Sequence, residues 1–146
     1  MTKLLHHMRV LVFGTFDVFH QGHRDFLRQA AACGDELSVI IARDRNVKQI
    51  KGVLPIDDEK TRLRNVRKYP AVVNARLGYE DLTNVYDVLN DIKPDVICLG
   101  YDQNGFADRL PEEIIRRGYA IPVIRLKAYK PQKFKSSLLR ASLRYA

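Results

Sequence analysis

The 146-residue chain has no tryptophan and only two cysteines, Cys33 and Cys98, whose spacing matches no metal-binding motif. This excludes a disulfide scaffold and predicts two reduced core thiols in the cytoplasm, although a redox-sensitive thiol is the alternative. No apolar run approaches the roughly 20 residues of a membrane-spanning helix. The first eight residues hold no apolar signal segment, so we expect a flexible N-terminus and no membrane partner.

The charge is unbalanced, since 25 basic and 17 acidic residues give a net charge of +8. Such a chain favours polyanions, which include nucleic acid, an anionic membrane and small phosphorylated substrates. The basic residues are scattered, and neither an aromatic RNA-binding motif nor a zinc-finger spacing is present. We therefore predict no nucleic-acid partner, and a non-catalytic module that binds nucleotide or nucleic acid is the remote alternative.

The length suits a single domain over residues 1–146, in which short apolar runs alternate with helical patterns. Strands are predicted at 9–13, 37–42, 71–73, 95–100 and 121–126, where Pro122 suggests a sheet edge or a strand start. Helices are expected between them, including 82–89 and 110–117, and a last helix is capped by Ser136 or Ser137. This order predicts an α/β fold with a doubly wound, Rossmann-like parallel sheet of about five strands.

The chemistry is concentrated after the first predicted strand, in Gly14 to His23. Gly22 lacks a side chain, and the start of the next helix offers free N–H groups and a positive dipole to an anion. His20 and His23 are three residues apart and so share one face of the first turn. Two imidazoles there are well placed to donate hydrogen bonds to a triphosphate. The alternatives are a structural pair or half of a zinc site, but no third ligand is evident nearby.

The ten residues GTFDVFHQGH at 14–23 resemble the signature of the cytidylyltransferase-like nucleotidyltransferase superfamily. The likeness continues through GDEL at 34–37, ARD at 42–44 and the segment 51–62. It implies transfer of a nucleoside monophosphate from a triphosphate to a phosphate group, with release of pyrophosphate. By this resemblance His20 and His23 are catalytic and contact the α- and β-phosphates. The nucleotide site would also include Thr15, Phe16, Gln21 and Gly22.

Two later segments, 97–103 and 125–129, resemble archaeal FAD synthases, which adenylate FMN with ATP. This resemblance places Asp102 and Tyr129 at the nucleotide, and the runner-up is CTP with glycerol 3-phosphate. Lys48 and Lys51 are predicted in a basic loop that either clamps the triphosphate or is merely solvated.

Further expectations concern two serines, two aspartates, a cation and the oligomeric state. Ser136 and Ser137 either contact phosphate or simply cap a helix. Asp17 either lines the site or caps a loop or helix, and Asp44 is either structural or orients metal-bound water. A divalent cation, most simply Mg²⁺, should arrive with the triphosphate and not in a protein cage. A homodimer is plausible.

Overall fold

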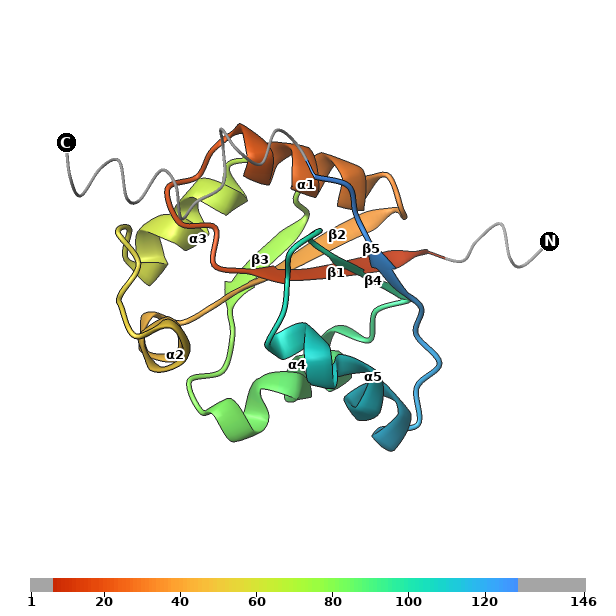
Figure 1. Ribbon diagram of the computed structural model, residues 1–146. Helices are drawn as coiled ribbons and strands as arrows, with labels where there is room; N and C mark the ends of the chain where they lie inside the picture. The colour runs from red at the N-terminus through yellow and green to blue at the C-terminus, as the bar shows by residue number, and fades with distance from the viewer. Residues whose placement is uncertain (1–6, 129–146) are drawn as a thin grey trace.

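The computed structural model describes residues 7–128, in which five parallel strands form one sheet in the order β3-β2-β1-β4-β5 (Figure 1). The strands are β1 (Arg9–Gly14), β2 (Glu36–Ile41), β3 (Asn74–Leu77), β4 (Val96–Leu99) and β5 (Val123–Arg125). The helices are α1 (Gln21–Ala31), α2 (Asp44–Lys51), α3 (Glu59–Arg67), α4 (Val88–Ile92) and α5 (Phe106–Arg116), with a 3₁₀ helix η2 (Leu82–Asp87) before α4.

Alternate residues of the central strand face opposite sides of the sheet, as the period of a strand requires. Val10 and Val12 pack in one core with residues of α1 and α3, whereas Leu11 and Phe13 pack in a second core with residues of α4 and α5. Figure 1 shows α1 and α3 above the sheet, and α4 and α5 below it. The predicted doubly wound α/β fold is therefore confirmed.

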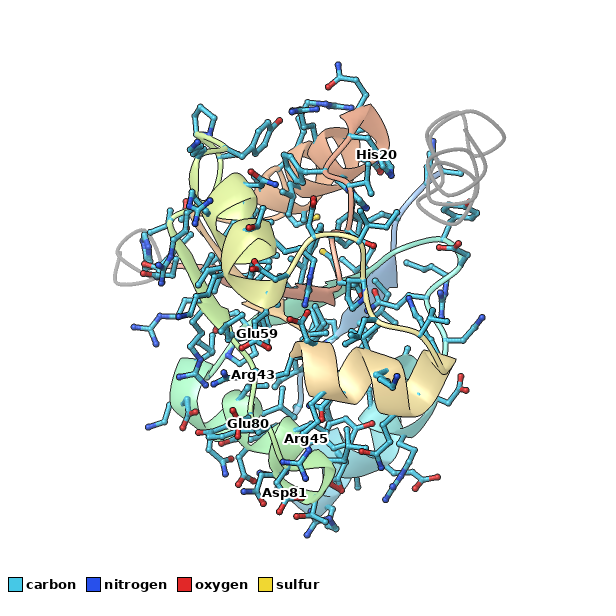
Figure 2. The ribbon with its side chains drawn as sticks, turned by 90° about the vertical axis from the view of Figure 1, so that its left-hand side faces the viewer. His20, Arg43, Arg45, Glu59, Glu80 and Asp81 are labelled. Carbon is cyan, nitrogen blue, oxygen red and sulfur yellow. The ribbon has the colours of Figure 1, made fainter. Side chains whose placement is uncertain are left out.

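The strand order reverses beside β1, because the chain builds β2 and β3 on one side of it and β4 and β5 on the other. In open parallel sheets a ligand binds at such a point, in the crevice outside the carboxyl ends of the strands. The loops that follow β1 and β4 therefore flank the expected site. Figure 2 looks toward this edge of the sheet, with His20 in the upper part of the view.

Two predictions about the half of the sheet beyond β2 were wrong. The third strand is 74–77 and not 71–73, because the amide of Val72 bonds to the Tyr69 carbonyl at 3.0 Å and keeps the chain in a turn after Pro70. The segment that carries Lys48 and Lys51 is a helix, α2, and not a loop. Gly52 ends α2 in the left-handed conformation, with φ of 83°, and its amide bonds to the Lys48 carbonyl.

The second half of the chain also differs in its boundaries. The 82–89 pattern divides into η2 and α4, and α5 begins at Phe106 although Pro111 lies inside it. The last strand is shorter than predicted, and it forms a sheet edge as Pro122 suggested. Tyr129, Ser136, Ser137 and the predicted final helix lie outside the described residues. Within 7–128 no helix has the length and apolarity needed to cross a membrane.

Candidate active site

Two histidines close the first turn of α1 on itself. His20 is the N-cap, and its Nδ1 accepts the Gly22 amide at 3.0 Å. In return the amide of His20 donates to Nδ1 of His23 at 3.3 Å, which completes a reciprocal capping box. The rings are stacked, with their centroids 3.8 Å apart. The predicted juxtaposition of the two histidines is therefore confirmed.

Burial keeps both rings neutral, and the two Nδ1 bonds determine which nitrogen carries the proton. Burial, with a smaller contribution from Arg24, lowers the pKa of His20 to about 4. Burial lowers the pKa of His23 to about 3, with help from neighbouring His20. A neutral imidazole whose Nδ1 accepts a hydrogen bond carries its proton on Nε2. At neutral pH the pair is therefore uncharged, and each ring has one Nε2–H to donate.

Aromatic contacts hold His23 in place. The Phe19 ring stacks on it with centroids 5.6 Å apart, and the buried Phe16 ring meets it edge-on at 5.4 Å. The guanidinium of Arg24 lies over the Phe19 ring, 4.8 Å from the ring centroid. The space beside Gly14 is filled by the Phe16 ring, because a Cβ at Gly14 would come within 2.6 Å of it.

The loop between β1 and α1 has an unusual backbone, and hydrogen bonds from another segment hold it in place. Phe16 and Val18 both adopt positive φ, at 55° and 50°, which is uncommon for residues with side chains. Between them the buried Asp17 accepts the amides of Ile56 and Asp57 at 2.8 and 2.9 Å. The carboxylate of Asp17 therefore joins this loop to the segment that precedes α3.

Arg62 connects three segments around the site. Its side chain is fully buried in α3 and donates to the Thr15 carbonyl at 2.8 Å, the Asp57 carbonyl at 3.0 Å and the Asp44 carboxylate at 2.7 Å. The loop after β1, the start of α2 and the loop before α3 thus share one guanidinium. We call Arg62 and these three partners the arginine junction.

The start of α2 is fastened to α3 by a second set of charges. Asp44 and Glu59 exchange bonds, each carboxylate accepting the other's amide, at 2.9 and 3.1 Å. Arg43 lies between two carboxylates, at 3.2 Å from Glu59 and 3.5 Å from Glu80, as Figure 2 shows. Asp44 is therefore a structural residue, which was one of its two predicted roles.

The loop after β4 is attached to the end of β1 by Gln103. Its amide nitrogen donates to the Phe13 carbonyl at 3.1 Å, and its amide oxygen accepts the N–H of Gly100 at 3.1 Å. Arg125 of β5 supports the same loop by donating to the Gly100 and Gln103 carbonyls. Asp102 is exposed on this loop, so its side chain is presented at the carboxyl edge.

The structure brings together some of the predicted site residues and separates others. Thr15, Phe16, Gly22 and both histidines form one unit around the start of α1, where Gln21 is exposed. The Gly22 amide donates to His20 inside the cap. Lys48 and Lys51 are exposed on the last turn of α2.

Sequence reasoning missed the roles of Arg62 and Gln103. Arginine in a polar helix gives no sign of full burial, because the acceptors that make burial possible come from three distant segments. Gln103 offered a weak signal, since it directly follows the Asp102 loop position.

No metal cage accompanies these residues, because within 7–128 no group of three or more histidine, cysteine or acidic side chains could hold an ion. The two cysteines of the sequence are free thiols, and burial raises the pKa of Cys98 to about 12.

Known proteins resemble this chain over most of its length. The cytidylyltransferase-like family model matches residues 11–142. The FAD synthase of Methanosarcina mazei is 47% identical over 123 residues, which cover 84% of this chain and 78% of the relative. The FAD synthase of Thermoplasma volcanium is 35% identical over 136 residues, covering 93% and 94%. A crystal structure from Thermoplasma volcanium, described as a lipopolysaccharide core biosynthesis protein, has a TM-score of 0.77 and 34% identity, covering 86% of this chain and 100% of that one.

Proposed function

We propose that this chain, which belongs to the cytidylyltransferase-like family, is an FMN adenylyltransferase that transfers AMP from ATP to FMN. The observation that carries the proposal is the similarity to proteins named FAD synthase, at 35–47% identity over 84–93% of the chain. The neutral histidine pair at the start of α1 agrees with it, because phosphoryl transfer is catalysed mainly by positioning and charge stabilisation.

The reaction needs no covalent intermediate on the protein. A phosphate oxygen of FMN attacks the α-phosphorus of ATP in line, and the bond from that phosphorus to the oxygen that bridges to the β-phosphorus breaks. Pyrophosphate leaves and FAD is formed. The Nε2–H groups of His20 and His23 donate to the oxygens on which negative charge increases. Because both rings are fixed by their Nδ1 bonds, little reorganisation is needed as charge moves.

The two imidazoles are neutral, so the negative charge of the triphosphate must be balanced by cations. A divalent cation, most simply Mg²⁺, enters in this proposal as part of the ATP substrate, which fits the lack of a protein cage in residues 7–128. We expect Lys48 and Lys51, which are exposed on the last turn of α2, to neutralise phosphate charge. We expect Asp102, which is exposed on the loop held by Gln103, to contact the nucleotide base.

The decisive experiment compares two complete reactions. Purified protein is incubated with ATP, FMN and Mg²⁺, and separately with CTP, glycerol 3-phosphate and Mg²⁺. FAD and CDP-glycerol are measured by chromatography, with pyrophosphate release as a second readout. We expect FAD in the first reaction and no product in the second. The His23→Gln variant, prepared in the same way, shows whether any product comes from a contaminant.

Product in the second reaction alone would replace the donor and acceptor but keep the reaction type. The homodimer, the cytoplasmic location and the lack of nucleic-acid binding stay predictions. Size-exclusion chromatography with light scattering tests the first. A salt titration of binding to duplex and single-stranded DNA tests the last, because binding through phosphates weakens steeply with salt.

A further inference from the structure

The end of α2 and the loop between α2 and α3 expose an unusual amount of aliphatic surface. Nine large hydrophobic side chains within residues 7–128 are exposed, and four of them lie in the seven residues from 50 to 56. We call these four, Ile50, Val53, Leu54 and Ile56, the aliphatic rim. Their exposed fractions run from 38% to 66%. Clustered exposed apolar side chains on a protein surface commonly mark a binding site.

The aliphatic rim is fixed to the catalytic loop and does not project freely from the fold. The Ile56 amide donates to Asp17, three residues before His20, at 2.8 Å. The next residue, Asp57, is held twice, by Asp17 through its amide and by Arg62 through its carbonyl. Figure 2 shows this loop on the viewer's side, between α2 and α3 and below His20. The rim therefore borders the site at the carboxyl edge.

The position of the rim relative to the other loops indicates which substrate it faces. The loop after β4, with Asp102, lies on one side of β1, and α2 with the rim follows β2 on the other side. With the base of ATP beside Asp102 and its α-phosphate at the histidines, an acceptor must approach from the remaining side. That side carries the rim together with Lys48 and Lys51, so apolar surface and positive charge are adjacent.

We propose that the aliphatic rim binds the isoalloxazine ring of FMN, while the neighbouring lysines attract its phosphate. This inference rests on the proposed function and adds to it the surface that distinguishes FMN from ring-less phosphate esters. A flat, largely apolar ring system would bury the exposed aliphatic side chains, and this burial would provide affinity. The chain has no tryptophan, so no indole ring can stack on the flavin.

The test removes the apolar surface and keeps the loop. In the double variant Val53→Ser/Leu54→Ser we expect the KM for FMN to rise about tenfold or more, because apolar contact area with the ring is lost. The kcat and the KM for ATP should change less than about twofold. Ile115→Ser is the matched control, since Ile115 is the most exposed large aliphatic residue of α5, on the other side of the sheet. Circular dichroism and thermal unfolding confirm that both variants fold.

Two ligand fragments separate the ring from the phosphate. Riboflavin has the ring without the phosphate, and its Ki as a competitor of FMN should rise in the double variant by the same factor as the KM. Ribitol 5-phosphate has the phosphate without the ring, and its weak competition should be unchanged. In Lys48→Gln/Lys51→Gln the pattern should reverse, with riboflavin unaffected and ribitol 5-phosphate weakened.

The outcomes keep this inference distinct from the proposed function. If the wild-type enzyme makes FAD and the double variant retains its KM for FMN, the rim is not the ring-binding surface and the proposed function stands. If the variant instead alters the oligomeric state with KM unchanged, the rim is an interface between copies, and the inference is wrong. A wild-type protein that neither binds FMN, measured by flavin fluorescence, nor makes FAD overturns both.

Discussion

The imidazoles of His20 and His23 are stacked 3.8 Å apart, and each ring accepts a main-chain amide through Nδ1. The same two side chains therefore cap the N-terminus of α1 and carry two Nε2–H groups there. The reciprocal cap needs the spacing of three residues, and the proposed mechanism uses the same two rings. Substitutions at these positions must separate the two roles to be informative.

His20→Asn should separate capping from catalysis. Asparagine is a good N-cap, so the variant should keep its stability, whereas His20→Ala should lose about 1 kcal/mol of unfolding free energy. Both variants lose the Nε2–H donor, and turnover should fall by about two to three orders of magnitude. Urea unfolding and initial rates at saturating ATP and FMN measure the two effects. Near-normal turnover in a folded variant would remove His20 from the mechanism.

The stability of the protein should fall as the pH drops from 6.5 toward 5. The pKa values of His20 and His23 in the fold, about 4 and about 3, lie below the ordinary value of 6.5. The unfolded chain therefore binds protons in this range that the folded chain does not, and the free energy of unfolding decreases. Well above pH 6.5 both rings are neutral in the folded and the unfolded chain, so this loss of stability disappears.

The melting temperature at pH 7.5 and pH 5.0 measures this effect. The measurements stop at pH 5 because carboxylates also change the stability at lower pH. Glu113 is one of them, since its hydrogen bond with Arg116 lowers its pKa to about 2. In His23→Gln the difference between the two pH values should shrink. An equal difference in both proteins would contradict the burial of His23 as a neutral ring.

Loss of the arginine junction should destabilise the fold more than the loss of any exposed charge on α3. Arg62→Met leaves the Asp44 carboxylate and two carbonyls without their donor, and removal of one partner of a buried ion pair costs about 3–5 kcal/mol. Arg64→Met, on the exposed face of the same helix, should change the free energy of unfolding by less than about 0.5 kcal/mol. Urea denaturation of both variants gives the comparison, and similar midpoints would contradict the junction.

Gly14→Ala should reduce activity through Phe16. The added Cβ would lie 2.6 to 3.1 Å from three atoms of the Phe16 ring, so the ring must shift from its edge-on contact with His23. We expect a loss of about 1–3 kcal/mol in stability and a lower kcat. Gly52→Asn is a control at a glycine with φ of 83° and nothing within 4 Å of an added Cβ, where asparagine is tolerated. Equal kcat values in the two variants would show that the ring adjusts without consequence.

Asp17→Asn should weaken the attachment of the aliphatic rim. An amide can accept only one of the two N–H groups that the carboxylate now accepts, so one buried donor loses its partner at a cost of about 1–3 kcal/mol. The KM for FMN should rise more than the KM for ATP, because the displaced loop is on the acceptor side. Steady-state kinetics with each substrate varied in turn measures the ratio, and equal changes would contradict this arrangement.

The parts of the fold that follow from local pattern could be predicted, and the parts that depend on distant partners could not. The buried run at 95–100 and Gly14, which ends β1, indicated the sheet and its expected functional edge. The helix α2 was missed because Val47 is its only buried hydrophobic residue, so its periodicity is weak. Its stability depends on Glu59 and on the left-handed Gly52.

The site shows the same division between local and distant causes. The spacing of His20 and His23 is local, and it correctly placed the rings together at the start of a helix. The bonds of Asp17 span 39 and 40 residues, and the Arg62 bond to Thr15 spans 47. No pattern in a single sequence indicates such pairings, since each depends on the tertiary fold.

The arginine junction has a consequence for attempts to change the acceptor by recombination. A donor segment that replaces residues 50–57 must still offer the Asp57 carbonyl to Arg62 and two amides to Asp17. Hydrogen bonds thus connect three segments that should be exchanged together: the loop after β1, the start of α2 and the rim. A replacement loop of another length should therefore misfold unless the loop after β1, the start of α2 and α3 are exchanged with it, whereas one of the same length and path should fold.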